Sequence, residues 1–180
     1  LLIIKAVQQD NIWMMISFPI FGVSLILLYL ASTLYHASKE PQKRFKLKVF
    51  DHAAIYVLIA GSYTPFTLVS LNGETGWLIF SMVWVMAFTG IILKLFFTGR
   101  FKVISTTMYV LMGWLIVFYF QDLTAHLHEK GVFYLILGGV LYTIGAILYS
   151  IKKIKFNHAI FHFFVLAGSF CHFLSIYLYV

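Results

Sequence analysis

Charged side chains are scarce in this sequence of 180 residues: they make up 11% of it, whereas 62% of the side chains are hydrophobic and the mean hydropathy is +0.93. A soluble globular domain carries about 25% charged residues, so this composition excludes that class. The apolar residues form runs of roughly 20 residues, each long enough to cross a bilayer as a helix. Because the runs are continuous and do not alternate with polar residues, they predict helices and not a β-barrel.

Cysteine and acidic residues are also few. The single cysteine, Cys171, excludes an intrachain disulfide. Six acidic residues stand against thirteen basic ones, which gives a formal net charge of +7. Such an excess can indicate nucleic acid binding, but here the basic residues lie in short segments between the apolar runs, which is typical of membrane orientation. No nucleic acid partner is therefore expected.

Glycine, asparagine, proline and clusters of charge interrupt the apolar runs and predict six membrane-spanning helices. The expected ranges are 12–37, 48–70, 76–97, 103–121, 131–151 and 157–180. The opening residues, LLIIKAVQQD, resemble the last turn and exit of an earlier helix. The sequence has no repeat, low-complexity tract or long linker, so residues 1–180 are expected to form one all-α, polytopic transmembrane domain.

Basic residues cluster in alternate connections between the predicted helices. Eleven of the thirteen lie around the first, third and fifth loops: Lys39, Lys43, Arg44, Lys46, Lys48, Lys94, Arg100, Lys102, Lys152, Lys153 and Lys155. By the positive-inside rule these loops face the cytoplasm. The C-terminus is then outside, and an additional helix before the first full span would begin in the cytoplasm.

Histidines within apolar helices are uncommon and usually face a protein interior or a water-filled cavity. His158 and His162 open the last predicted helix four residues apart, so their side chains point toward the same neighbour. His36 closes the first full helix, Ser32 lies one turn earlier, and Asp51 opens the next helix. The order of the loops places all five residues in the cytoplasmic leaflet, within roughly 10 Å of the interface.

Three imidazole ligands with an open fourth position are typical of a catalytic zinc site, and His36, His158 and His162 are the candidate ligands. The His-x-x-x-His pair lacks the glutamate of HExxH proteases, so a base must come from elsewhere. Asp51, the only carboxylate at this level within a predicted span, is the candidate to accept a proton from a water at the metal or to hold that water. Ser32 is the candidate to donate a hydrogen bond to a substrate carbonyl or to Asp51.

Each candidate also has a structural interpretation. The histidines of the last helix can hydrogen-bond across helices, and His36 can be a solvated residue at a helix end. Asp51 can be an acid stabilised by the helix dipole, and Ser32 can be a small packing residue. His172 shares roughly the face of His158 but lies about 20 Å farther along the helix, so it is left out of the metal site.

Four stretches resemble the hemolysin III family, bacterial relatives of the progestin and adipoQ receptors, which include the adiponectin receptors. These are LYLASTLYHA, FDHAAIYVLIAGSYTPFTLVS, KLFFTGRFK and FNHAIFHFFVLAGSFCHF, and together the resemblance covers nearly the whole chain. It implies a protein of the bacterial plasma membrane with seven helices, of which the first is missing or truncated here, and a cytoplasmic N-terminus. It also implies zinc held by three histidines near the cytoplasmic face, here His36, His158 and His162, with Asp51 and Ser32 near a water.

The predicted function is a zinc-dependent hydrolase that cleaves an amide, or an ester, in a membrane lipid at the cytoplasmic leaflet. The resemblance supports this function, because the superfamily includes alkaline ceramidases and the adiponectin receptors are associated with ceramidase activity. Two alternatives stay open: a cytolytic membrane protein, as the family name suggests, and a receptor or sensor with a structural zinc. A pore normally needs a polar lining, and no predicted span carries a stripe of charges.

Overall fold

The structure, a computed structural model, describes residues 1–97, 102–151 and 153–180. Every regular element in these ranges is helical: α1 (Leu2–Gln8), α2 (Ile12–Ala37), α3 (Pro41–Pro65), the π-helical turn η1 (Phe66–Leu71), α4 (Glu74–Phe97), α5 (Lys102–Gly113), the 3-10 turn η2 (Leu115–Tyr119), α6 (Phe120–His126), α7 (Glu129–Ser150) and α8 (Asn157–Tyr179). Within the described residues, six segments are long and apolar enough to cross a membrane: Ile12–Ala37, Pro41–Leu71, Glu74–Phe96, Ile104–His126, Glu129–Ser150 and Asn157–Tyr179. The predicted class, an all-α polytopic membrane protein, is therefore confirmed.

The bounds of α2 agree with the predicted range of 12–37 because clear signals mark its ends. The side chain of Asn11 caps the first turn by accepting hydrogen bonds from the backbone N–H groups of Trp13 and Met14, at 2.9 and 3.2 Å. Asparagine is among the strongest N-cap residues, so this helix begins where its apolar run begins. Pro19 lies inside α2 without ending it.

The start of α3 differs from the predicted one, because this helix begins at Pro41 and not near residue 48. Proline is favoured in the first turn, where its missing N–H is not needed and its φ is already helical. As a result, Lys43, Arg44 and Lys46, which the sequence places in a loop, lie on the first turns of α3. At its other end α3 reaches Pro65 and continues into η1.

The fourth predicted helix, 103–121, is in the structure three shorter elements, α5, η2 and α6. Gly113 ends α5, and glycine weakens a helix interior. The next residue, Trp114, has non-helical backbone angles and donates a hydrogen bond from its indole N–H to Thr143 Oγ1 at 2.8 Å. The sequence does not predict this break, because the hydropathy of the run does not change at Gly113 and Trp114.

Lys94, one of the basic residues around the third predicted loop, lies in the last turn of α4, within the predicted helix 76–97, and is buried. Its Nζ donates a hydrogen bond to Ser105 Oγ at 2.6 Å and lies 5.9 Å from the centre of the Tyr109 ring. Two other basic loop residues, Arg100 and Lys152, lie outside the described residues.

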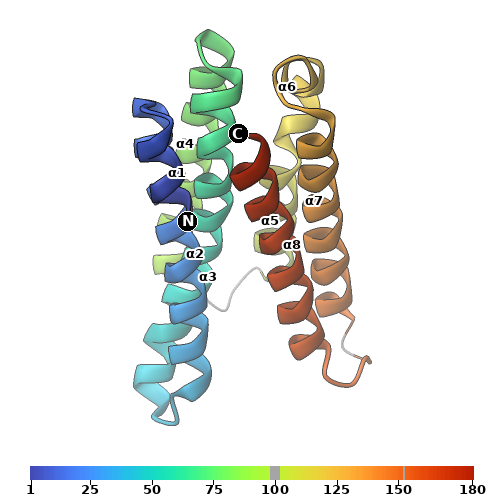
Figure 1. Cartoon of the computed structure of the whole chain (residues 1–180). Helices are drawn as coiled ribbons and strands as arrows, with labels where there is room; N and C mark the ends of the chain where they lie inside the picture. The colour runs from blue at the N-terminus through green and yellow to red at the C-terminus, as the bar shows by residue number, and fades with distance from the viewer. Residues whose placement is uncertain (98–101, 152) are drawn as a thin grey trace. The chain divides into compact units, whose positions relative to one another are not determined.

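The chain divides into two compact units, Leu1–Met112 and Gly113–Val180. In the first unit, α2 and α3 pack side by side, α3 also contacts α4, and α1 lies against α2 (Figure 1). Its fully buried side chains include Phe18, Phe21, Tyr56 and Ile79. In the second unit, α7 and α8 form an antiparallel pair (Figure 1). The single-domain organisation expected from the sequence stays a prediction.

Small residues allow α7 and α8 to approach each other closely. A Cβ added at Gly138 would overlap the ring of His172, and one at Gly145 would meet the Cβ of Phe164 at 2.9 Å. Hydrogen bonds join the same helices, since Ser175 Oγ donates to the carbonyl of Gly131 at 2.7 Å. Close contact through small residues, with hydroxyl groups bonded across the interface, is typical of helices that pack within a membrane.

Candidate functional site

In the first unit, the contact between α2 and α3 brings three of the candidate residues together. His36 lies in the last turn of α2, Ser32 lies one turn before it, and Asp51 lies on the facing side of α3. The Ser32 hydroxyl donates a hydrogen bond to the Asp51 carboxylate, and the imidazole of His36 interacts electrostatically with the same carboxylate. Ser32 and Asp51 are both buried, whereas His36 is exposed.

Burial makes the hydrogen bond from Ser32 important for Asp51. Removing a carboxylate from water costs free energy unless other groups replace its hydration. A hydroxyl donor supplies part of that replacement. The bond also fixes the orientation of the Asp51 carboxylate toward α2, the helix that carries His36. The first unit therefore provides an oriented carboxylate next to an exposed imidazole.

Tyr35 packs against His36 and Arg44 packs against Tyr35, and the sequence interpretation missed both contacts. The ring of Tyr35 lies 4.7 Å from the imidazole of His36, with an angle of 58° between the ring planes. The guanidinium of Arg44 lies over Tyr35, 5.4 Å from its ring centre. Tyr35 and Arg44 are only nine positions apart, so the short turn between α2 and α3 makes this contact possible. The tyrosine thus links a cationic side chain of α3 to the end of α2.

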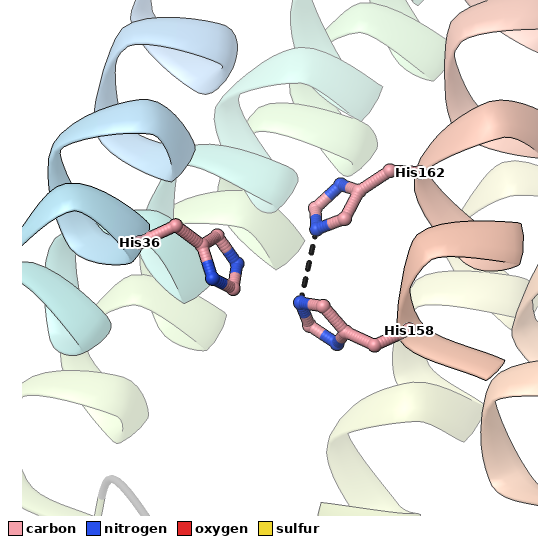
Figure 2. Close-up of side chains that lie close together, drawn as sticks. All are labelled: His36, His158 and His162. Carbon is pink, nitrogen blue, oxygen red and sulfur yellow. Dashed lines mark hydrogen bonds between the residues drawn. The ribbon is translucent and has the colours of Figure 1, made fainter. Parts of the chain in front are cut away.

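In the second unit, His158 and His162 lie in the first turns of α8 and face each other. Figure 2 shows their contact, in which the two Nε2 atoms are 3.0 Å apart. The rings meet edge to face, with their centres 4.6 Å apart and their planes at 81°. The four-residue spacing produces this geometry, because residues i and i+4 of a helix lie one above the other.

The start of α8 is held in place by its connection to α7. Asn157 donates a hydrogen bond from its side-chain amide to the carbonyl of Tyr149, at 3.0 Å, and Tyr149 lies at the end of α7. The ring of Tyr149 also packs against His158, with 5.5 Å between the ring centres. These contacts order the turn from which His158 projects.

The distance between the two Nε2 atoms fits a shared metal ion. With Zn–N bonds of about 2.0–2.1 Å, two nitrogens 3.0 Å apart subtend an angle of about 95° at the metal. This value is somewhat below the tetrahedral angle, and a small side-chain rotation would reach it. His158 and His162 are half-buried, so part of each ring remains accessible.

Other polar residues near the candidates have different surroundings. His172 lies farther along α8, where its Nε2 contacts the carbonyl of Leu135 at 3.3 Å and its ring packs edge-on against Tyr142. It therefore belongs to the packing of α7 against α8, away from the His158 and His162 pair. His52 follows Asp51 in α3, and its carbonyl accepts a hydrogen bond from the Tyr109 hydroxyl at 3.0 Å.

The helices and their hydropathy define a polytopic membrane protein, and one span of the second unit opens with a pair of facing imidazoles. A family model described as Haemolysin-III related matches residues 1–173. The chain belongs to this family, and the resemblance noted in the sequence is confirmed.

The relatives that match this chain include proteins of bacteria and of mammals. The Hemolysin-3 homolog of Bacillus subtilis (strain 168) is 47% identical over 178 residues, which are 99% of this chain and 84% of the relative. The Hemolysin-3 of Bacillus cereus is 44% identical over 180 residues, covering 100% of this chain and 82% of the relative. The human Monocyte to macrophage differentiation factor is 28% identical over 181 residues, covering 96% and 74%.

Proposed function

We propose that this protein is a zinc-dependent hydrolase of the bacterial plasma membrane that cleaves the amide bond, or an ester bond, of a membrane lipid. The proposed zinc ligands are His36, His158 and His162, which Figure 2 draws as sticks. The observation that carries the proposal is the approach of the His158 and His162 Nε2 atoms to 3.0 Å within a span that is otherwise apolar. Histidines are uncommon in such a setting, and this geometry suits shared coordination.

The order of the spans supports a single site for the three histidines. A chain that crosses the membrane six times, from α2 to α8, has the end of α2 and the start of α8 at the same membrane face. His36 lies at the first of these positions, and the His158 and His162 pair lies at the second. The basic residues around the connections at this face support its assignment to the cytoplasm, and the proposed orientation has the C-terminus outside and the N-terminus of a seven-helix chain inside.

The proposed roles of the residues follow from their chemistry. Zinc held by the three histidines would polarise the carbonyl of the scissile bond and make a water molecule more acidic. Asp51 would accept the proton as that water attacks the carbonyl carbon, and would then pass it to the leaving amine or alcohol. Ser32 would hold the Asp51 carboxylate in position through the hydrogen bond that joins them. The products would be a fatty acid and the remainder of the lipid.

We expect the purified protein to release fatty acid from an N-acyl sphingoid lipid in mixed micelles, and we expect metal removal to stop this reaction. A membrane-permeable chelator should reduce fatty acid release to the background rate, and added Zn²⁺ should restore it while Mg²⁺ should not, because magnesium prefers oxygen ligands. Mass spectrometry of released fatty acids measures both steps. A zinc-loaded protein that turns over neither amide- nor ester-linked lipids would contradict the hydrolase proposal.

Cytolysis is the second candidate, because two bacterial relatives are named Hemolysin-3 and Hemolysin-3 homolog. The two functions predict different behaviour of a variant in which His36, His158 and His162 are all replaced by alanine. Dye release from liposomes that persists in this variant, without fatty acid release by the original protein, would favour cytolysis. If neither the original protein nor the variant releases dye, the result contradicts cytolysis.

A further inference from the structure

Basic side chains are concentrated where α2 ends and α3 begins. Five of them lie within the ten residues from 39 to 48, and we call this set the basic turn: Lys39, Lys43, Arg44, Lys46 and Lys48. The first four are exposed and Lys48 is half-buried. Glu40 is the single acidic residue between positions 38 and 50, so the segment has a formal charge of +4.

The basic turn is ordered on a helix and is not a flexible loop. Four of its five members lie in the first turns of α3, which begins at Pro41, and the backbone N–H of Arg44 donates to the carbonyl of Glu40 at 2.8 Å. The positive-inside rule requires only an excess of positive charge in a connection. The helix adds to this excess of charge, because it fixes the backbone positions from which the basic side chains reach a ligand.

Apolar side chains lie among these charges. Phe45 is 57% exposed and Phe50 is 42% exposed, although both are large and aromatic. A shallow, open groove runs along one side of the helix and is lined by Pro41, Gln42, Phe45 and Lys46. A surface that combines exposed aromatic rings with lysines suits the boundary between lipid headgroups and acyl chains, where each kind of side chain finds a favourable environment.

Arg44 is held by packing against α2. Its guanidinium lies over the ring of Tyr35, 5.4 Å from the ring centre, and Tyr35 in turn packs against His36. This cation–π contact involves no oxygen acceptor, so the N–H groups of the guanidinium can still donate hydrogen bonds to oxygen atoms. The guanidinium of an arginine can bind a phosphate through two parallel hydrogen bonds.

We propose that the basic turn binds the phosphate headgroup of an anionic phospholipid, with Lys43, Arg44 and Lys46 as the main contacts. The charge of the segment is complementary to the phosphate. Its position also selects a lipid, because it joins two consecutive membrane spans and therefore lies at the level of the headgroups. The exposed Phe45 ring would contact the glycerol and upper acyl region, which a soluble phosphate does not have. This binding requires neither zinc nor hydrolysis.

The test uses the purified full chain in detergent, titrated with phosphatidylglycerol or phosphatidylcholine and analysed by native mass spectrometry. Each basic residue near a membrane surface contributes about fivefold to anionic lipid binding. A variant with Lys43→Gln, Arg44→Gln and Lys46→Gln should therefore bind phosphatidylglycerol on the order of 100-fold more weakly. Binding by the original protein should prefer phosphatidylglycerol to phosphatidylcholine and should weaken as salt is added.

Two control variants separate this site from general electrostatic attraction. Lys130→Gln, Lys153→Gln and Lys155→Gln together remove the same charge elsewhere and should leave the binding within about twofold of the original, because they lie outside the basic turn. Lys43→Arg and Lys46→Arg together keep the charge and leave Arg44 in place, so they should retain most of the binding, which also shows that this region tolerates substitution. Equal loss in the two neutralised variants, or equal binding of the two lipids by the original protein, would overturn the proposal.

Discussion

Replacing His162 with alanine is expected to lower the zinc content of the purified protein from about one ion per chain to nearly none. The substitution removes one of the two Nε2 atoms that lie 3.0 Å apart at the start of α8, and with it half of the proposed chelate. His158→Ala should have the same effect, because each histidine supplies one half of that chelate. Inductively coupled plasma mass spectrometry on metal-loaded, desalted protein measures the result.

The matched control for this measurement is His126→Ala. His126 is exposed at the end of α6, where its Nδ1 contacts the carbonyl of Asp122 at 2.8 Å, so its loss should leave the zinc content unchanged. Circular dichroism should show the same helix content in all three variants, since a ring removed from a half-buried position leaves the backbone hydrogen bonds intact. Equal zinc in the original protein and His162→Ala would refute the assignment of this pair as ligands.

His36→Ala tests the third ligand separately. His36 belongs to the first unit and the other two histidines belong to the second, so its assignment depends on the order of the spans. A three-histidine site predicts that His36→Ala also loses most of its zinc. Full retention of zinc in this variant, together with loss in His162→Ala, would restrict the metal to the α8 pair.

The helices could be predicted from the sequence where hydropathy and capping residues agree. α2 has both an asparagine cap and a continuous apolar run, and its bounds were predicted correctly. The predicted start of α3 is wrong because the charges of Lys43, Arg44 and Lys46 resemble a loop, whereas Pro41 begins a helix there. The break after Gly113 cannot be predicted from hydropathy, because the run stays apolar across it, and the bond from Trp114 to Thr143 joins residues that are distant in sequence.

Some contacts of the candidate residues can be predicted from the sequence alone, and others cannot. Helical spacing is sufficient to predict that His158 and His162 face each other, since a four-residue interval fixes their direction. The sequence names Asp51 as one of two acceptors for the Ser32 hydroxyl, but spacing cannot select it, because the hydrogen bond depends on how α2 and α3 are rotated against each other. The packing of Arg44 on Tyr35 was missed for the same reason. Contacts within one helix follow from periodicity, whereas contacts between helices require the packed structure.

Asp51→Asn is expected to reduce fatty acid release by about 10²–10⁴-fold while the zinc content stays near that of the original protein. Asparagine has nearly the shape of aspartate and its side-chain oxygen can still accept the hydrogen bond from Ser32, so the packing of α2 on α3 should be preserved. It cannot accept a proton as a carboxylate does, and the proposed attack by water therefore loses its base. Paired measurements of zinc content and initial rate on the same preparation provide the result.

Two further variants distinguish loss of the base from loss of structure. Asp122→Asn removes an acidic side chain from the exposed first turn of α6 and should keep full activity. Ser32→Ala leaves the carboxylate of Asp51 in place but removes its hydrogen bond, so a smaller decrease, of about tenfold, is expected. If Asp51→Asn retains the original rate with zinc bound, Asp51 is not the base. If Asp51→Asn loses zinc as completely as His162→Ala does, Asp51 maintains the metal site and the loss of activity has a structural cause.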